Sequence, residues 1–192
     1  MVEHVLGKDE VTGSIPVVSS VIDSPMIETS RLLLREYTLE DIPAHHRILS
    51  DPITMKFWPR PFTEEESRSW LERAISSYST NGFGRYAVIL RETGEQIGDA
   101  GVMRTEVNGK PEVDLGYIIH ADHWRRGFGL EAAIASLEFG LTSGERRIVA
   151  NMAHDNIASL RVAERLGMTK EQEFYNSRNR DILTYLYTFC LP

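Results

Sequence analysis

The sequence contains a single cysteine, no long apolar run and no excess of basic residues. Cys190 stands alone among 192 residues, so an internal disulfide and a cysteine-based metal site are both excluded. No apolar run approaches the roughly 20 residues that a membrane-spanning helix requires. Because the amino end also lacks a signal-peptide pattern, we expect a cytoplasmic protein that does not bind membranes.

The charge balance is acidic, with 28 Asp and Glu residues against 21 Lys and Arg residues and a formal net charge of −7. A nucleic-acid-binding protein normally carries a basic face, so nucleic acid is an unexpected partner. The same balance mildly favours a cationic small molecule or an amine-bearing peptide. The hydrophobic fraction of 42% and the charged fraction of 26% are typical of one globular domain.

The order of the predicted elements indicates an α+β or α/β domain with a mixed sheet. We interpret residues 1–25 as an N-terminal extension, flexible or docked, with a short strand at 15–18, and residues 26–192 as the domain. The domain is predicted to contain strands at 32–34, 86–91, 96–104, 112–119, 147–152, 174–176 and 182–189. Helices are predicted at 39–49 after Thr38, from the Thr63–Glu66 capping box onward, from Phe128 onward, and from Asp155 or Asn156 to Gly167.

A glycine-bearing turn between a strand and a helix is the most informative segment. It reads Trp124-Arg125-Arg126-Gly127-Phe128-Gly129-Leu130-Glu131. Such a turn exposes several backbone N–H groups at the positive end of the helix, which suits a phosphate or pyrophosphate. Arg125 and Arg126 add positive charge. An ordinary tight bend is the alternative, whereas a dinucleotide-binding fold is excluded because its glycines follow the first strand of a βαβ unit.

The chain from about Ile27 to Phe189 resembles a GNAT-superfamily N-acetyltransferase, and more narrowly the ribosomal-protein N-acetyltransferase-like (RimJ/RimL-type) branch. The resemblance rests on Thr29-Ser30-Arg31-Leu32-Leu33-Leu34-Arg35, Val113-Asp114-Leu115-Gly116-Tyr117-Ile118-Ile119, the turn with Ala132, Asn156-Ile157-Ala158-Ser159, and Arg165-Leu166-Gly167-Met168. It implies a mostly antiparallel central sheet flanked by helices. It also implies transfer of an acetyl group from acetyl-coenzyme A to a primary amine by direct attack, with no metal.

The resemblance also implies where the cofactor would bind. The N–H groups of Arg125, Arg126, Gly127, Phe128, Gly129 and Leu130 would hold the pyrophosphate. In this superfamily the preceding strand splays from its neighbour, so backbone groups around Ile118, Ile119 and His120 would hold the pantetheine. Asn156 would reach the pantetheine or the adenylate-side arm. Arg125 departs from the family pattern, which frequently has Gly there.

Two carboxylates on the strand at 112–119 are candidates for the general base. Glu112 and Asp114 are two residues apart, so both side chains point to one face of the strand. A carboxylate can take the proton that an ammonium must lose before it attacks. Solvated charges at the edge of the sheet are the alternative interpretation. Asp114 is the better candidate because it is closer to the expected splay.

The leaving thiolate requires a proton or a hydrogen bond. Many superfamily members use a tyrosine seven residues after the Asn156 position, but here that position is Ala163. The resembling branch offers a serine instead, which Ser159 matches. Ser159 could equally be a first-turn serine that satisfies backbone groups. The histidines show no metal-binding spacing.

These observations predict an acetyl-coenzyme A-dependent N-acetyltransferase whose acceptor is a protein N-terminus or a small-molecule amine. The competing hypothesis is a non-catalytic module that senses coenzyme A or acyl-coenzyme A, or bridges partners. A structural protein that binds phosphate is a weaker third hypothesis. The aromatic residues Phe57, Trp58, Phe62 and Trp70 are expected to form core or to line the acceptor groove. Exposed edge strands are compatible with a monomer or a homodimer.

Overall fold

The computed structural model describes residues 27–191, so the predicted N-terminal extension and its short strand lie outside the described residues. The strands are β1 (Ile27–Glu28), β2 (Leu32–Arg35), β3 (Arg85–Leu90), β4 (Gln96–Val107), β5 (Lys110–Ile119), β6 (Arg147–Ala153), β7 (Thr169–Asn176) and β8 (Ile182–Cys190). The α-helices are α1 (Ile42–Leu49), α2 (Glu64–Asn81), α3 (Phe128–Thr142) and α4 (Ile157–Arg165). Two short 3-10 helices are η1 (Leu39–Asp41) and η2 (Ala121–His123).

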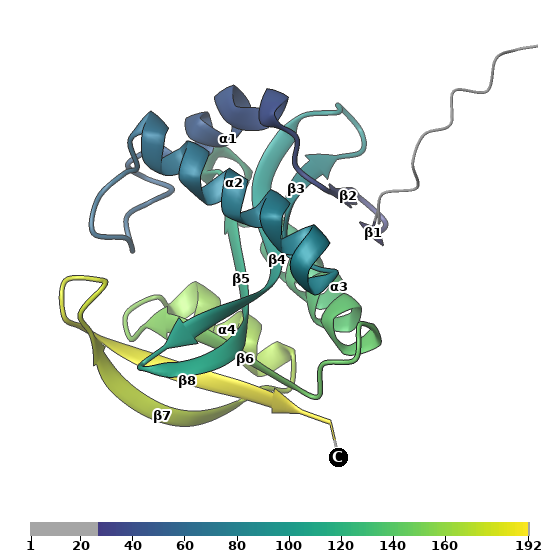
Figure 1. The fold of residues 1–192 in the computed structure, drawn as a ribbon. Coiled ribbons are helices and arrows are strands. Elements are labelled where there is room, and N and C mark those ends of the chain that lie inside the picture. Colours follow the sequence, from purple (N-terminus) through teal and green to yellow (C-terminus); the bar gives the residue numbers. More distant parts are fainter. Residues whose placement is uncertain (1–26, 192) are drawn as a thin grey trace, which may run out of the picture.

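The eight described strands form one mixed sheet in the order β1-β2-β3-β4-β5-β6-β8-β7 (Figure 1). Neighbouring strands run antiparallel except β5 and β6, which are parallel. A parallel pair requires a crossover connection, and α3 supplies it. The predicted α+β class with a mixed, mostly antiparallel sheet is confirmed.

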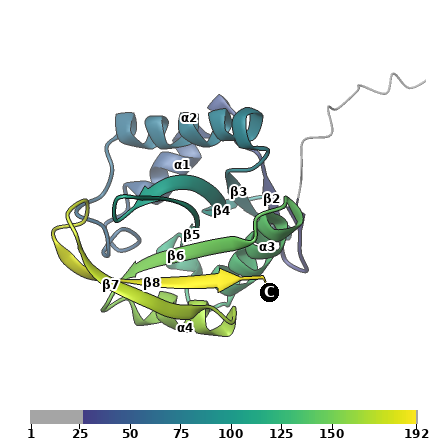
Figure 2. The same cartoon turned by 60° about the horizontal axis from the view of Figure 1, so that its bottom comes forward.

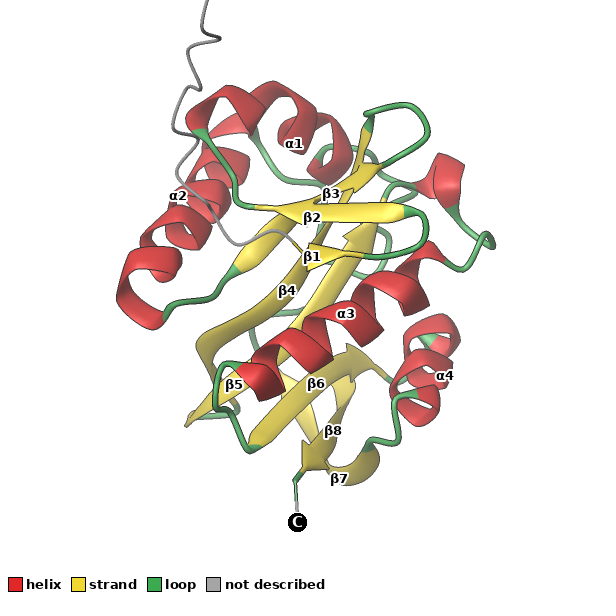
Figure 3. Ribbon diagram, turned by 90° about the vertical axis from the view of Figure 1, so that its right-hand side faces the viewer, coloured by secondary structure: helices red, strands yellow, loops and turns green. Residues whose placement is uncertain are grey.

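The helices cover both faces of the sheet. Helices α1 and α2 lie against one face, while α3 and α4 lie against the other (Figures 2 and 3). Beneath α3 and α4, the core includes Val102, Leu115 and Ile148, which come from three different strands. This arrangement puts the junction of β5 and β6 between the two helical layers, where both helix pairs can contribute side chains.

The capping signal for α2 is confirmed. The hydroxyl of Thr63 accepts a hydrogen bond from the Glu66 N–H at 3.2 Å, and the Thr63 N–H donates to the Glu66 carboxylate at 2.8 Å. The helix is followed by Gly82 with a left-handed φ of 77°. Reciprocal capping of this kind satisfies two N–H groups that would otherwise lack partners.

Several predicted boundaries differ from the structure, and two of the differences have a clear physical cause. The first helix was expected to begin at Leu39, but residues 39–41 form η1 and the α-helix begins at Ile42. Pro43 has no N–H, so an α-helical hydrogen bond to Leu39 cannot form. Strand β7 begins at Thr169 rather than at 174. Its added residues are mostly polar, and antiparallel pairing with β8 makes them a strand despite the absence of an apolar pattern.

Candidate active site

Strands β5 and β6 separate soon after they meet. Their parallel pairing is centred on Asp114 and Val149, close to the start of β6, so the carboxyl-terminal half of β5 leaves its neighbour. A cleft of about 670 Å³ lies at this separation. Its lining includes Asp114, Tyr117 and Ile118 of β5, Asn151 of β6, and Ser159 of α4. The strand separation expected from the family resemblance is therefore present.

The hydrogen bonds at the end of β5 indicate which main-chain groups face the cleft. The His120 N–H donates to the Ile97 carbonyl at 2.9 Å, and residues that bond to one neighbour alternate along an antiparallel strand. His120 and Ile118 therefore direct their main-chain groups to β4, whereas Tyr117 and Ile119 direct theirs to the opened side. The Ile119 carbonyl already accepts from Trp124 Nε1 at 2.7 Å. The groups left for a ligand are those of Tyr117 and the Ile119 N–H.

The turn before α3 has the backbone of an anion-binding site. Arg125 has a φ of 62° and Gly127 a φ of 82°, so two left-handed residues direct successive N–H groups to one side. Within residues 27–191, no protein acceptor bonds the N–H groups of residues 125–130 apart from the helix itself. The left-handed φ of Arg125 also explains why glycine is frequent at this position in the family.

Glu131 holds this turn against the loop between β1 and β2. One of its carboxylate oxygens accepts from the Thr29 hydroxyl at 2.6 Å and from the Arg31 N–H at 2.9 Å, and the other accepts from Arg31 Nε at 2.7 Å. Arg31 also donates to the Arg126 carbonyl at 2.8 Å. The Thr29–Arg31 segment, recognised in the sequence only as a family feature, therefore has the structural role of positioning the turn.

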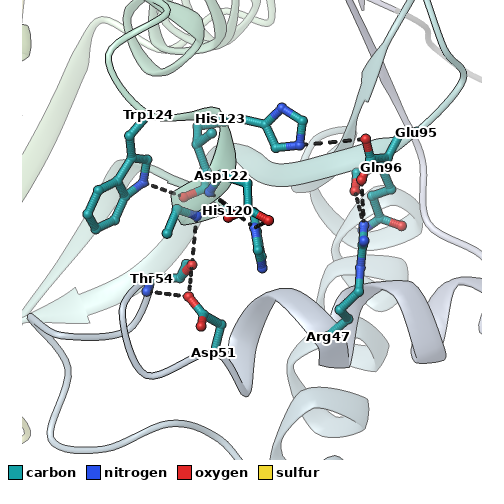
Figure 4. Close-up of polar contacts among 11 residues, drawn as sticks. Arg47, Asp51, Thr54, Glu95, Gln96, His120, Asp122, His123 and Trp124 are labelled. Atoms are coloured by element: carbon teal, nitrogen blue, oxygen red, sulfur yellow. Dashed lines mark hydrogen bonds and ion pairs between the residues drawn. The ribbon is translucent and has the colours of Figure 1, made fainter.

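A second set of contacts fixes the segment between β5 and the turn (Figure 4). The Ala121 N–H donates to the Thr54 hydroxyl at 2.9 Å, and Asp51 accepts from that hydroxyl at 2.5 Å. His123 lies 3.6 Å from the Glu95 carboxylate, which also pairs with Arg47 at 3.0 Å. This histidine is therefore part of the scaffold that positions the turn.

Tyr117 connects the turn with the cleft. A Cβ added at Gly129 would lie 3.1 Å from Tyr117 Cε2, so the tyrosine ring packs directly against the first turn of α3. Its hydroxyl donates to Ser159 Oγ at 3.3 Å. Asn156 is the N-cap of α4, and its side-chain oxygen accepts from the Ser159 N–H at 3.3 Å. Tyr117 and Ser159 thus face each other across the separated strands.

The two candidate carboxylates have different surroundings. Asp114 lines the cleft and accepts from Asn151 Nδ2 at 2.8 Å. Burial raises the pKa of its carboxyl to about 6, against the opposing effect of the Arg85 charge. Glu112 is held in a bidentate ion pair by Arg147, at 3.0 and 2.9 Å. A carboxyl group with a pKa near 6 can exchange a proton near neutral pH. Asp114 is therefore better suited than Glu112 to act as a general base.

Aromatic side chains line the opposite wall of the cleft. The rings of Trp58, Phe62 and Trp70 contact one another edge to face, with centroid separations of 5.4 to 5.9 Å. These side chains pack on the buried residues of α1 and also line the cleft. The charged residues among the cleft-lining side chains are Arg73, Arg85, Arg104, Glu106, Asp114 and Arg178. The acidic balance of the whole chain is therefore not concentrated in this cleft.

Three residues of the site were missed in the sequence. They are Arg85, Asn151 and the hydroxyl of Tyr117. A detectable signal existed for the first two, because Arg85 begins the apolar strand β3 and Asn151 interrupts the apolar run 148–153 of β6. Burial of such a residue is costly unless it has a partner, so it is a candidate for a site. Tyr117 offered no such signal, since a tyrosine in an alternating strand is ordinary.

Between residues 27 and 191, no three His, Cys, Asp or Glu side chains gather closely enough to hold a metal ion. No helix in the same range is long and apolar enough to span a membrane.

The chain belongs to the GNAT acetyltransferase family. A family model for the acetyltransferase (GNAT) domain matches residues 31–169, which includes the separated strands, the turn and the Asn156–Ser159 segment. The protein is therefore an acetyl-coenzyme A-dependent acetyltransferase, as the sequence predicted.

Named relatives agree with this assignment. The chain is 31% identical over 167 residues to "Uncharacterized N-acetyltransferase p20" of Bacillus licheniformis, covering 83% of this chain and 93% of the relative. An acetyltransferase of the GNAT family from Bacillus anthracis superposes with a TM-score of 0.71 at 27% identity, covering 86% of this chain and 98% of that one. RimL, a ribosomal α-N-protein acetyltransferase solved in complex with coenzyme A, shares the fold with a TM-score of 0.72 at 21% identity, covering 87% and 98% of the two chains.

Proposed function

We propose that the protein transfers the acetyl group of acetyl-coenzyme A to a primary amine, by direct attack while both substrates are bound. The observation that carries the proposal is the position of Asp114. This half-buried carboxylate lines the cleft at the separated strands, and Tyr117, which lines the same cleft, packs against the first turn of α3. Tyr117 thereby links the proton acceptor in the cleft to the proposed anion site at the turn.

The residues present fit coenzyme A. The N–H groups of residues 125–130 would bind the pyrophosphate, with the charges of Arg125 and Arg126 beside them. The main-chain groups of Tyr117 and the Ile119 N–H would bind the amides of the pantetheine arm in the manner of an added strand. Asn156 would contact the same arm from the start of α4. When bound, acetyl-coenzyme A supplies an acetyl group activated as a thioester.

Asp114 would act as the general base. The acceptor binds as an ammonium and must lose a proton before its nitrogen can attack the acetyl carbon. The carboxylate of Asp114 takes this proton directly or through a water molecule, and Asn151 holds it in place. A pKa of about 6 leaves the group deprotonated above neutral pH while keeping it a better base than an ordinary aspartate.

Ser159 would assist departure of the sulfur. Its oxygen already accepts a hydrogen bond from the Tyr117 hydroxyl, so its own proton is free to point at the departing thiolate. Burial raises the pKa of Tyr117, so this hydroxyl stays protonated and remains a donor. A serine alone is too weak an acid to protonate the thiolate fully. The pair would therefore stabilise its charge by hydrogen bonding.

The acceptor is a small-molecule amine or a peptide N-terminus. Both carry the primary amine that the chemistry requires, and the aromatic wall of Trp58, Phe62 and Trp70 offers an apolar surface beside the base. A RimL structure shares the fold, and its name concerns a ribosomal α-N-protein acetyltransferase. A panel of acceptors must therefore contain both chemical classes.

The test is release of free thiol from acetyl-coenzyme A in the presence of small amines and of peptides with free N-termini. We expect at least one acceptor to accelerate release above hydrolysis. Asp114→Asn should lower kcat by about 10²–10⁴-fold, the usual contribution of a general base, while coenzyme A still binds in calorimetry. The proposal is wrong if no acceptor accelerates thiol release.

Glu112→Gln is the matched comparison, because it removes a carboxylate two residues away on the same strand. We expect this variant to keep most of its kcat, since Glu112 is already committed to Arg147. The opposite pattern would assign the base to Glu112. Coenzyme A binding without turnover for any acceptor would instead favour a sensor of coenzyme A.

A further inference from the structure

Arg85 extends across the sheet over two glycines, and Gly116 leaves room for its guanidinium near Asp114. In the register of the sheet, Arg85 of β3 is opposite Gly101 of β4, and Gly101 is opposite Gly116 of β5. The three residues form one row across the strands. Arg85 Nη1 donates to the Gly101 carbonyl at 3.2 Å, so the side chain extends over β4 and its guanidinium reaches β5.

Gly116 is the position on which this arrangement depends. A Cβ added at Gly116 would lie 2.3 Å from Arg85 Nη2 and 2.5 Å from Nη1, so any other residue would displace the guanidinium. Asp114 is two residues before Gly116 and therefore on the same face of the strand. The guanidinium is thus placed beside the proposed base, on the side of the cleft that both residues line.

Asp99 forms an ion pair with Arg85 and holds its side chain in place. Its carboxylate lies 3.5 Å from Arg85 Nε, and the exposed fractions of the two side chains are 0% and 7%. The other carboxylate oxygen accepts from the Tyr37 hydroxyl and from Trp70 Nε1, both at 3.2 Å. Behind Tyr37 lies His45, whose pKa burial lowers, so that this histidine is neutral at physiological pH. The network therefore fixes the guanidinium without adding a second cation.

The remaining charges around Asp114 come from several elements. The negative charge of Glu112, on the same strand, opposes ionisation of Asp114. Arg147 of β6 forms an ion pair with Glu112. The other charged residues that line the cleft are Arg73 of α2, Arg104 and Glu106 of β4, and Arg178 of the loop between β7 and β8. Arg104 is paired with Glu145, and Arg178 with Glu106. Arg85 is consequently the buried cation that acts on Asp114.

We propose that Arg85 is a positioning residue whose charge, directed over Gly116 by Asp99, stabilises the ionised form of Asp114 and keeps it available as a proton acceptor. This inference rests on the proposed function of Asp114. It adds that Gly116 serves to admit the guanidinium of Arg85. Without that charge, burial would favour the protonated carboxyl, which cannot accept the proton of the acceptor amine.

The first experiment compares the pH dependence of kcat/KM for wild type, Arg85→Met and Gly116→Ala with one acceptor. The acidic limb reports ionisation in the free enzyme and in the acceptor amine, and the acceptor contribution cancels between variants. Loss of a nearby opposite charge raises a carboxyl pKa by about 1–3 units. We expect both variants to move the Asp114 midpoint upward by about one unit or more, because one removes the charge and the other displaces it.

Two further variants serve as controls. Arg85→Lys retains a positive charge and should leave the midpoint closer to wild type than Arg85→Met does. Arg73→Met removes another cleft arginine, which packs on Trp70 and is exposed, and should leave the midpoint unchanged whatever its effect on the rate. Circular dichroism establishes that each variant is folded. Gly116→Ala keeps the test valid if Arg85→Met does not fold.

A direct titration of the Asp114 carboxyl by carbon NMR separates this inference from the proposed function. An upward shift in Arg85→Met that is absent in Arg73→Met supports the role of Arg85, even if Asp114→Asn proves active and Asp114 is not the base. An unmoved Asp114 titration in both Arg85→Met and Gly116→Ala would overturn the inference. Asp114 would then remain the base if Asp114→Asn is inactive.

Discussion

Replacement of Asp114 by Asn should stabilise the protein at alkaline pH more than at acidic pH. The folded state holds this carboxyl half-buried beside Asn151, and desolvation raises its pKa to about 6 from the usual 3.8. A group with a raised pKa binds its proton more tightly in the folded state than in the unfolded state. The free energy of unfolding of the wild type therefore falls as the pH rises between these two values.

The size of the effect follows from the displacement of the pKa. Each unit corresponds to about 1.4 kcal/mol, so a displacement of roughly two units amounts to about 3 kcal/mol over the whole range. Between about pH 4.5 and about pH 8, about 2 kcal/mol of this stability is lost. Asn has nearly the same shape as Asp and does not ionise. Asp114→Asn should therefore escape this loss.

Urea unfolding of both proteins at the two pH values measures the effect. The quantity of interest is the stability of Asp114→Asn minus that of wild type, compared between the two conditions. Changes in packing or in the hydrogen bond from Asn151 cancel in this comparison, because they do not depend on pH. Asp181→Asn, an exposed carboxylate in the last turn, controls for the loss of one negative charge. An equal difference at both pH values, or a larger one at acidic pH, would refute the burial argument.

Three other changes test the scaffold of the site. Glu131→Ala removes the hydrogen-bond acceptor that holds the β1–β2 loop to α3. It should lower the free energy of unfolding by about 1.5–3 kcal/mol and weaken coenzyme A binding in calorimetry. Glu138→Ala, at an exposed position of the same helix, should change neither quantity. Arg125→Gly relieves a φ of 62°, worth about 1 kcal/mol, and should raise the unfolding midpoint, so a lower midpoint would contradict the strain. Tyr117→Phe should lower kcat while coenzyme A still binds; an unchanged kcat would exclude a role for this hydroxyl.

Local sequence patterns were sufficient to predict those features that depend on residues close together in the chain. The Thr63–Glu66 capping box identified the start of α2, because a helix terminus satisfies its N–H groups with residues three positions apart. The turn before α3 was recognised for the same reason, since its glycines and arginines are adjacent in the chain. The separation of β5 from β6 had a different origin, because a splayed strand before the turn was expected from the family resemblance.

Contacts between distant strands could not be predicted from the sequence. Arg85, Gly101 and Gly116 form a row only when β3, β4 and β5 take one particular register. The segments read separately do not give that register, and a shift of one residue would move each of these side chains to the opposite face. The choice between Glu112 and Asp114 had the same limit. Each is a carboxylate on one face of β5, and only the partner strand distinguishes the ion-paired group from the one that lines the cleft.

The position of Ala163 explains why the hydroxyl groups of this site come from elsewhere. Ala163 stands where many superfamily members have a tyrosine, and its side chain is 2% exposed within the core beneath α4. This face of α4 is therefore used for packing. The hydroxyls near the separated strands belong instead to Tyr117 of β5 and Ser159 of α4, which approach each other from opposite sides. In this pair the Tyr117 proton forms the hydrogen bond to Ser159, which leaves the Ser159 proton able to point into the cleft. A serine can therefore supply a hydrogen-bond donor where the usual tyrosine is absent.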